Sequence, residues 1–555
     1  MKKQILFFLL LIIYSQAISQ NFNLKIKGEN EIENKIIDSI GYKTSHVNTK
    51  SIIDENNLFL DRIRKEGYCE SNMISNIKIK DSIFQFNYSI GGKTNFIHIY
   101  VEEKFLEFIP VGYTKIKDTI ILPFKQSELF LNSIVKKLEI NGFSMARVKL
   151  INIQKKSKSI LADLSIQEEI KRKLNDIVIK GTAKFPESHK KNILRLYQNK
   201  VFNQKNLENL YTDFEKIRFV KQTKYPEILF TKDSTKVYVY LEKAKSNTFD
   251  GFVGFTNDEN KNVVLNGYLD LSLNNILNSG EKIALNWKSD GKGQKTFNLG
   301  IDLPYIFKSP LVLKTQLNIF KQDSTFQNTQ TSIDLGYLLN YNKRFFIGYQ
   351  STESNNIKNL LTSNLSSYNN SFVTSSMEFV TFKSDDFLFP EKTRLDIKTG
   401  FGKRESKLSS DKQIFSELTF KNNFYLNDKN IFYLKTQHFY LQSNSYIINE
   451  LHRFGGINSI RGFNENSLQG NLFSAILTEY RFVISPSLYA HSILDYAIIQ
   501  DKTTNTSSNL YGIGIGIGIL SKNGLFNLVY ANGSTNDQTS KLSNSIVHVS
   551  FKATF

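Results

Sequence analysis

From Phe249 to the C-terminal Phe555 the chain alternates apolar and polar residues with a period of two, and helical spacing largely disappears. Loops rich in Asn, Ser, Asp and Gly separate the alternating segments, for example at 350–370 and 501–509. About 305 residues at roughly 19 per strand and connection allow about sixteen strands. In the last segment one face carries Val547, Val549, Phe551, Ala553 and Phe555, and the other carries His548, Ser550, Lys552 and Thr554.

A strand that faces lipid on one side and water on the other needs this alternation, and in lipid the sheet must close to leave no unpaired edge. The sequence therefore predicts an all-β transmembrane barrel of about sixteen antiparallel strands over residues 246–555. A soluble β-sandwich is the alternative. It would not need a chain of this length that ends on an aromatic strand.

The N-terminus has the pattern of a secretory signal peptide over residues 1–19. Lys2 and Lys3 precede the apolar run Ile5–Ile13, and Ala17-Ile18-Ser19 offers a small-x-small cleavage site. No cysteine follows that site for a lipid anchor, and no later stretch approaches the 18 apolar residues of a membrane-spanning helix. The exported chain is therefore soluble in the periplasm, secreted, or a closed barrel in an outer membrane.

Residues 20–245 contain three repeats of one pattern: a short alternating stretch, helical apolar spacing, and two further alternating runs. We expect three small α/β modules in series, at 20–92, 93–170 and 171–245. The helical part runs on to Gly67 in the first repeat and Gly142 in the second, whereas the third has no such glycine.

The composition excludes several classes of function. One cysteine, Cys69, forbids an internal disulfide and a multi-cysteine metal site, and seven histidines leave little room for a metal cluster. HExxH, CxxC and GxSxG are absent, and Gly91-Gly92-Lys93-Thr94 lacks the earlier glycine of a phosphate loop, which favours a turn between modules. We expect no enzyme, no metal and no cofactor.

The net charge of +19 is uneven. Residues 21–250 carry 40 Lys+Arg against 28 Asp+Glu, and residues 251–555 carry 29 against 24. A basic first half could suggest nucleic acid or an anionic membrane surface, but export argues against nucleic acid and a lysine-rich proteome also explains the excess.

Three elements near the C-terminus predict charged or bare positions inside the barrel. Alternation directs Glu479 inward, together with Arg481, and directs Asp495 inward from the next strand. Gly512, Gly514, Gly516 and Gly518 alternate with isoleucines, so one face of that strand has no side chains and allows a close approach.

The segment upstream, Phe454–Phe463, contains three glycines and a lone arginine, Arg461, between two strands. If it folds into the lumen, Arg461 can pair with Asp495 or with Glu479 as a bidentate ion pair. Alternatively, the acidic groups only line a watery pore.

These residues resemble a known family. Gly455-Gly456 and Ser459-Ile460-Arg461-Gly462-Phe463 resemble the (V/I)RG(F/Y) signature in the sixth extracellular loop of the BamA/TamA-like outer-membrane insertase superfamily. Glu479-Tyr480-Arg481, Asp495-Tyr496-Ala497, the 512–518 strand and the terminal Phe555 follow in that family's order. Asn274–Glu281, Asp302–Tyr305 and Asp386–Pro390 are similar to its barrel elements, and the three repeats are similar to its POTRA modules.

The resemblance implies that Gly455, Gly456, Ile460, Arg461, Gly462 and Phe463 form the signature loop. Its arginine would contact Asp495 on the inner wall, with Glu479 as a second acidic partner. Three modules without an obvious plug helix favour the insertase side of the family, closest to TamA.

The expected function is insertion of unfolded outer-membrane proteins into the outer membrane of a Gram-negative bacterium, with the modules in the periplasm. The barrel would part at a lateral seam between its first and last strands, with Phe249, Gly251 and Val253 on one side and Phe551 and Phe555 on the other. Partners would be these clients, outer-membrane lipid and an inner-membrane or lipoprotein partner. The alternative is a two-partner-secretion-type pore for one dedicated protein; a passive porin would not need three modules.

Overall fold

A computed structural model describes residues 21–113, 115–181, 184–198, 200–257, 263–289, 293–357, 365–383, 386–407, 409–536 and 545–555. The signal peptide predicted at 1–19 lies outside these residues. The chain divides into two compact units, Met1–Arg172 with Val201–Lys205, and Lys173–Lys200 with Asn206–Phe555. Among the described residues, no helix is long and apolar enough to cross a membrane.

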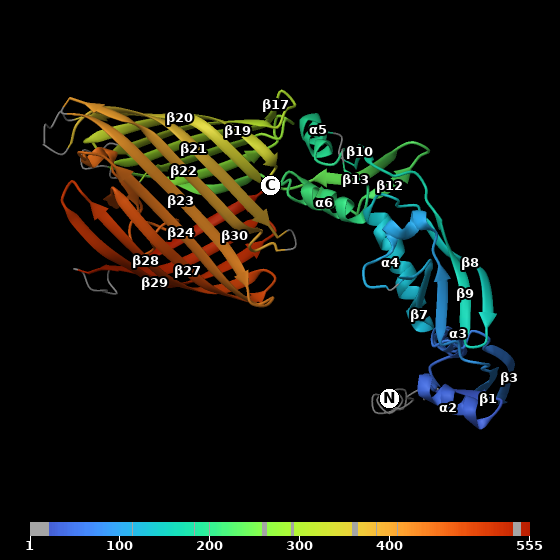
Figure 1. The fold of residues 1–555 in the computed structure, drawn as a ribbon. Helices are drawn as coiled ribbons and strands as arrows, with labels where there is room; N and C mark the ends of the chain where they lie inside the picture. The colour runs from blue at the N-terminus through green and yellow to red at the C-terminus, as the bar shows by residue number, and fades with distance from the viewer. Residues whose placement is uncertain are drawn as a thin grey trace, which may run out of the picture. The chain divides into compact units, whose positions relative to one another are not determined.

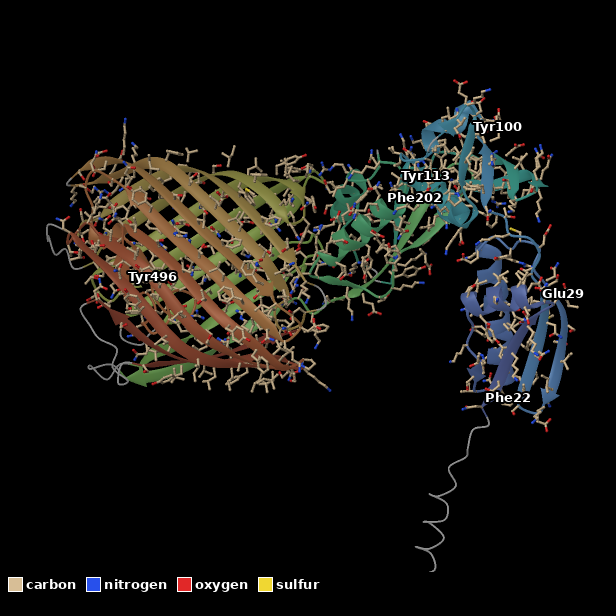
Figure 2. All side chains as sticks on the ribbon, turned by 60° about the horizontal axis from the view of Figure 1, so that its bottom comes forward. Phe22, Glu29, Tyr100, Tyr113, Phe202 and Tyr496 are labelled. Atoms are coloured by element: carbon tan, nitrogen blue, oxygen red, sulfur yellow. The ribbon has the colours of Figure 1, made fainter. Side chains whose placement is uncertain are left out.

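The first module has the predicted order of one strand, helices and two strands. Its elements are β1 (Phe22–Gly28), α2 (Glu31–Ile40), β2 (Ser45–His46), α3 (Thr49–Lys65), β3 (Asn72–Lys80) and β4 (Ile83–Ser89), with the sheet order β2-β1-β4-β3. Asn30 and Asn48 cap the two helices by accepting backbone hydrogen bonds. Phe59 of α3 and Leu24 of β1 are fully buried in the core between helices and sheet. In Figure 2, Phe22 marks the start of β1, and Glu29 is the residue that follows its end.

The second module departs from the predicted order because a hairpin replaces its first helix. The elements are β5 (Phe96–Tyr100), the 3-10 helices η1 (Glu103–Phe108) and η2 (Phe124–Gln126), β6 (Lys115–Ile116), β7 (Thr119–Pro123), α4 (Ser127–Ile140), β8 (Arg147–Lys156) and β9 (Ser159–Gln167). Pro110 and Gly112 follow η1 and prevent a longer helix there. The resulting sheet has five strands in the order β6-β7-β5-β9-β8.

The glycines after the long helices lie where one module passes into the next. Thr94 N donates a hydrogen bond to Gly67 O over 2.8 Å, and Arg172 N donates to Gly142 O over 2.9 Å. A Cβ on Gly67 would lie 2.3 Å from Thr94 O, which no side chain could tolerate. The Gly91–Thr94 segment is therefore part of this joint. The third repeat is followed by the barrel, so it needs no equivalent glycine.

The third module belongs to the same compact unit as the barrel. It consists of β10 (Leu174–Gly181), α5 (Glu187–Arg195), α6 (Gln204–Glu215), β11 (Val220–Gln222), β12 (Glu227–Phe230) and β13 (Thr235–Lys243). The sheet order is β10-β13-β11, and β12 also pairs with β13. β10 and β13 are parallel, as β1 and β4 are in the first module.

The remainder of the chain is a closed barrel of sixteen strands, as the alternation predicted (Figure 1). Every consecutive pair is antiparallel. The strands are β14 (Thr248–Asn257), β15 (Val263–Asn274), β16 (Lys282–Ser289), β17 (Gln294–Ile306), β18 (Leu311–Gln322), β19 (Phe326–Asn340), β20 (Lys343–Asn356), β21 (Tyr368–Phe382), β22 (Glu391–Ser406), β23 (Ser410–Tyr425), β24 (Asn430–Gln442), β27 (Leu472–Ser485), β28 (Leu488–Asp501), β29 (Thr506–Ser521), β30 (Gly524–Thr535) and β31 (Ile546–Thr554).

The outer wall is apolar. Ile513 and Ile515 of β29 are 60% and 66% exposed, and Leu494 of β28 is 65% exposed. Tyr496 lies on the same outer face (Figure 2). Exposed aliphatic side chains at this density suit a lipid surface. The predicted tandem α/β modules and sixteen-stranded membrane barrel are confirmed at the level of fold.

Candidate functional site: a clamped loop inside the barrel and an open seam

The long connection between β24 and β27 folds onto the inner wall. It contains the 3-10 helix η3 (Ile448–Glu450) and a small hairpin of β25 (His452–Phe454) and β26 (Leu468–Gly470). Because β24 pairs directly with β27, the barrel closes without this segment, hereafter the loop (443–471). Its side chains contact inward-facing residues of many strands, so the loop occupies the lumen.

Arg461 at the tip of the loop is 4% exposed and binds both predicted carboxylates. Its Nε donates to Asp495 Oδ2 over 2.8 Å and its Nη2 donates to Asp495 Oδ1, which makes the fork-shaped bidentate pair. Its backbone N also donates to Asp495 Oδ2, over 3.1 Å, and its Nη1 donates to Glu479 Oε1. The structure thus brings Arg461, Asp495 and Glu479 into one buried cluster.

Glu479 extends this cluster to a second arginine on its own strand. Arg481 Nε donates to Glu479 Oε2 over 2.7 Å, and Arg481 Nη1 donates to Asn423 Oδ1 over 2.8 Å. The Arg481 guanidinium also lies 4.0 Å from the ring centre of Tyr433. Each carboxylate of the cluster therefore has an arginine partner, which buried charges require. The sequence placed Arg481 inside the barrel but gave no sign of its partners.

Glycines let the loop lie directly on the backbone of the wall. A Cβ on Gly512 of β29 would lie 2.5 Å from Arg461 O. Gly462 has φ +86°, and a Cβ there would lie 2.3 Å from the backbone N of Gly533 on β30. The bare face predicted for β29 thus meets the signature loop at Gly512. At Gly516 and Gly518 it meets neighbouring side chains, His491 and Tyr489.

The rest of the signature packs beside the arginine. Ile460 is fully buried in an apolar cluster with Phe454, Phe473 and Leu477, and Phe463 packs against the edge of this cluster. Gly455 and Gly456 have φ of +113° and +94°, where the chain turns after β25. Apolar packing and the ion pairs therefore hold the same short segment.

A second anchor, which the sequence did not reveal, holds the base of the loop. Arg404 of β22 is fully buried and donates to Glu450 of η3 and to Asp411 of β23. Beside it, Asn449 Nδ2 donates to Ser354 Oγ over 2.7 Å. These residues are widely separated in the chain and follow no motif, so only the strand register brings them together.

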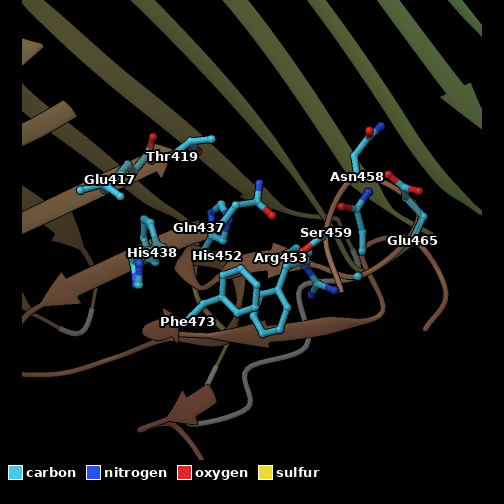
Figure 3. Close-up of a pocket in the computed structure, with 15 residues that line it drawn as sticks. Glu417, Thr419, Gln437, His438, His452, Arg453, Asn458, Ser459, Glu465 and Phe473 are labelled. Atoms are coloured by element: carbon cyan, nitrogen blue, oxygen red, sulfur yellow. The ribbon is translucent and has the colours of Figure 1, made fainter. Parts of the chain in front are cut away.

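Between the two anchors a cavity of about 210 Å³ separates the loop from β23 and β24. Figure 3 shows Glu417 and Gln437 of these strands facing Arg453, Asn458 and Glu465 of the loop. The loop is therefore clamped at its two ends and less tightly packed between them.

The barrel closes weakly at one seam. Among the described residues, β14 and β31 pair at Thr248↔Thr554 and Phe249↔Ala553, and Asn247 and Phe555 exchange backbone hydrogen bonds of 3.3 and 3.0 Å below them. On its other side β14 pairs along its whole length with β15, and β31 pairs with β30 from Gly524↔Ala553 to Ala531↔Ile546.

Of the predicted seam residues, Phe249 is in the paired part, and Phe551 and Phe555 are exposed on the outer face. Gly251 follows the last pair, and a Cβ there would lie 2.5 Å from Tyr268 O of β15. The side chain of Val253 lies outside the described residues.

The third module contacts the near end of the barrel through α5. His189 of α5 is fully buried, with ring contacts to Tyr305 at the end of β17 (4.7 Å between centres) and to Tyr341 before β20 (5.8 Å). Asn192 Nδ2 donates to Lys308 O over 3.2 Å. Burial, with the nearby charge of Arg344, lowers the pKa of His189 to about 3, so the ring is neutral in this contact.

Within the described ranges, no group of three or more His, Cys, Asp or Glu side chains is placed to hold a metal ion.

No family model and no curated protein matches the chain. Solved structures match its fold. CdiB from Escherichia coli aligns with 91% of this chain and 98% of its own, at 13% identity and a TM-score of 0.51. The fold of this chain is the fold of CdiB.

CdiB from Acinetobacter baumannii aligns with 96% of this chain and 90% of its own, at 12% identity and a TM-score of 0.50. BamA from Haemophilus ducreyi lacking POTRA domains 1–3 aligns with 77% of this chain and 93% of its own, at 14% identity and a TM-score of 0.46. At these identities the likeness concerns the fold, and the alignment with both CdiB structures spans the modules as well as the barrel.

Proposed function

We propose that this chain is an insertase that folds β-barrel proteins into the outer membrane of a Gram-negative bacterium, with its three modules in the periplasm. The seam carries the proposal. Beyond two residue pairs, the facing edges of β14 and β31 have no partner among the described residues. A strand edge with free N–H and C=O groups binds another strand, and it does so with little regard to side chains. An unfolded client strand can therefore add at this seam.

The modules support the capture of clients before insertion. Each sheet has a strand at its edge whose side chains are mostly exposed: β3, β8 and β12. In β3 the apolar Ile74, Ile77 and Ile79 are about half exposed on the edge. Such an edge binds an extended apolar segment by strand addition. Insertion itself would draw on the folding free energy of the client, so the proposal includes no cofactor and no enzymatic step.

The clamped loop supports a barrel that opens at one place. Arg461 ties the loop to β27 and β28, and Arg404 ties it to β22 and β23. These strands are held both by their full ladders and by the loop, whereas the seam is held by two residue pairs and the backbone hydrogen bonds below them. The proposed function therefore needs the loop as a brace, with outer-membrane lipid around the wall and an inner-membrane or lipoprotein partner for delivery.

The proposal is tested with residues 20–555 in liposomes, by timing the folding of an added urea-unfolded small barrel protein. We expect acceleration over empty liposomes. A disulfide through Thr248→Cys and Thr554→Cys, in a Cys69→Ser background, should slow client folding about tenfold or more, with recovery after reduction. The matched control is Thr381→Cys with Thr393→Cys, a directly opposed threonine pair in the β21–β22 ladder. Equal rates with the seam oxidised and reduced would contradict insertion at the seam.

A dedicated secretion pore is the second candidate, because a cavity of about 610 Å³ lies in the lumen between the loop and the wall. A pore would pass its client through this space. Deleting residues 450–470 should then enlarge conductance and alter the export of one protein. A broad fall in many outer-membrane proteins would favour the insertase instead.

A further inference from the structure

The 610 Å³ cavity has a chemistry that insertion does not require. It lies against the inner wall of β17–β21, β23 and β24, towards the strand ends opposite those that meet the third module. Asn298 and Asn318 line it near the far ends of β17 and β18, whereas Tyr305 at the near end of β17 contacts His189. Its size is that of a pocket for a small organic ligand.

The two halves of this wall differ in polarity. The half near the third module carries ion pairs such as Arg344–Asp302 and Lys314–Glu378. The cavity wall carries carboxamides instead, and Asn318 Nδ2 donates to Gln330 Oε1 over 3.0 Å. Carboxamides both donate and accept hydrogen bonds without a net charge. The cavity thus offers uncharged polar groups in neighbouring rows.

Two of these carboxamides have an acceptor oxygen without a partner. Asn328 Nδ2 donates to Asn449 O over 2.7 Å, and Gln413 Nε2 donates to Glu450 Oε2 over 2.8 Å. These donations fix which end of each amide is the oxygen, and both oxygens are buried without a hydrogen bond from the described residues. A buried acceptor without a donor is costly. The missing partner is therefore a hydrogen-bond donor, which an anion without O–H groups, such as sulfate, is not.

Aromatic rings line the same cavity. Phe372 and Phe415 form an edge-to-face pair with centres 4.9 Å apart. The charged groups on the cavity wall are Glu450, which is paired with Arg404, Arg453, whose guanidinium lies 5.2 Å from the ring centre of Phe320, and Glu417. The cavity therefore combines apolar faces with hydrogen-bond donors and acceptors, most of which are uncharged.

We propose that this cavity binds a neutral oligosaccharide. Sugar hydroxyls donate and accept hydrogen bonds together, which matches carboxamides, and the C–H faces of a pyranose ring pack on aromatic rings. A neutral ligand also leaves the ion pairs of the loop undisturbed. Because η3, His452 and Arg453 line the cavity together with the wall, the bound sugar contacts both.

The test uses the full chain in nanodiscs, with maltoheptaose as the probe and saturation-transfer NMR as the measurement. Asn318→Leu with Gln330→Leu removes a hydrogen-bonded amide pair from the cavity. Gln294→Leu with Gln322→Leu removes a hydrogen-bonded amide pair of β17 and β18 that lies four residues beyond Asn298 and Asn318, outside the cavity. We expect saturable transfer in the wild type and in the second variant, and about tenfold weaker binding in the first.

Equal binding in both variants, or no transfer to the wild type, would overturn the proposal. A neutral Ser/Gln-rich peptide that binds where maltoheptaose does not would also overturn it and assign the cavity to polypeptide. Repeating the titration with a glycolipid that carries the same glucose chain separates two sources of the sugar. Tighter binding than the free sugar assigns a membrane-borne glycan, and equal binding assigns a free one.

Discussion

Two parts of the same barrel wall differ in how they are held. β28 and β29 pair without interruption from Leu488↔Ile519 to Asp501↔Thr506, and the loop is bound to this side through Arg461 and Asp495. The first and last strands pair at Thr248↔Thr554 and Phe249↔Ala553 among the described residues. Closure of the ladder and stability of the wall are therefore separate properties. The strand ladder of a barrel can be closed and still contain one seam whose strands separate at a low cost in free energy.

Loss of Arg461 on the clamped side should destabilise the docked loop more than any other change considered below. Arg461→Ala leaves Asp495 buried without its fork and Glu479 with one arginine, which should destabilise the docked loop by about 3–5 kcal/mol. The barrel should remain folded, since its ladders do not depend on the loop. Hydrogen exchange of residues 456–463 should rise sharply and client folding in liposomes should slow. Arg461→Lys keeps the charge but loses the fork, so it should fall between wild type and alanine. Unchanged exchange in Arg461→Ala would show that the ion pairs do not hold the loop.

Weakening the second anchor should destabilise the docked loop less. Glu450→Gln keeps the shape of the side chain and removes its charge beside Arg404, which should cost about 1.5–3 kcal/mol because hydrogen bonds to charged groups have this strength. Exchange should rise at Ile448–Glu450 more than at the tip. Protection that falls equally along the whole loop would mean that the two anchors act as one unit.

The contact of the third module with the barrel should depend on pH. The pKa of His189 is lowered from 6.5 to about 3 when it is docked, so docking is fully stable above about pH 6.5 and weakens as the pH falls towards 3. At pH 5 the loss is about 2 kcal/mol. Spin labels at Lys191→Cys of α5 and Phe307→Cys of the β17–β18 connection, in a Cys69→Ser background, should show a broader distance distribution at pH 5 than at pH 7.5. His189→Phe should remove this pH dependence, and a dependence that persists in it would assign the titration to another group.

The stability of the docked loop should change least when a solvent-exposed ion pair between the loop and the wall is removed. Lys288 of β16 lies 3.0 Å from Glu465, and both side chains are about a third exposed. Lys288→Ala should therefore change loop protection by about 0–1 kcal/mol. It serves as the control for Arg461→Ala, since both variants remove a cation that pairs the loop with the wall. A loss as large as that of Arg461→Ala would remove burial as the reason for the difference.

Much of the fold could be predicted from sequence because it depends on local periodicity. Alternation predicted about sixteen strands, and the repeats predicted three modules. The predicted order of elements in the second module was wrong in detail, because β6 and β7 are too short for alternation to distinguish them from a loop. The signature segment predicted a role for Arg461, and the alternation along two neighbouring strands predicted that Glu479 and Asp495 point inward. A contact of Arg461 with these carboxylates was therefore expected.

The remaining contacts depend on register, which periodicity does not encode. Arg404 and Glu450 are 46 residues apart, and nothing in either segment marks a partner. The short pairing of β14 with β31 was also invisible, because both strands alternate normally over their whole lengths. Residues far apart in the chain become neighbours only when sixteen registers are fixed together.

Hydrogen exchange of the strand amides in nanodiscs tests whether the barrel is weakly held at the seam between β14 and β31. In β31, amides between Ile546 and Lys552 that point towards β14 should exchange quickly, while those that point towards β30 stay protected. Amides of Ile513–Leu520 in β29 should be protected on both sides. This alternating protection in β31 is the result that we expect from a seam held by two residue pairs. Uniform protection of β31, equal to that of β29, would contradict it.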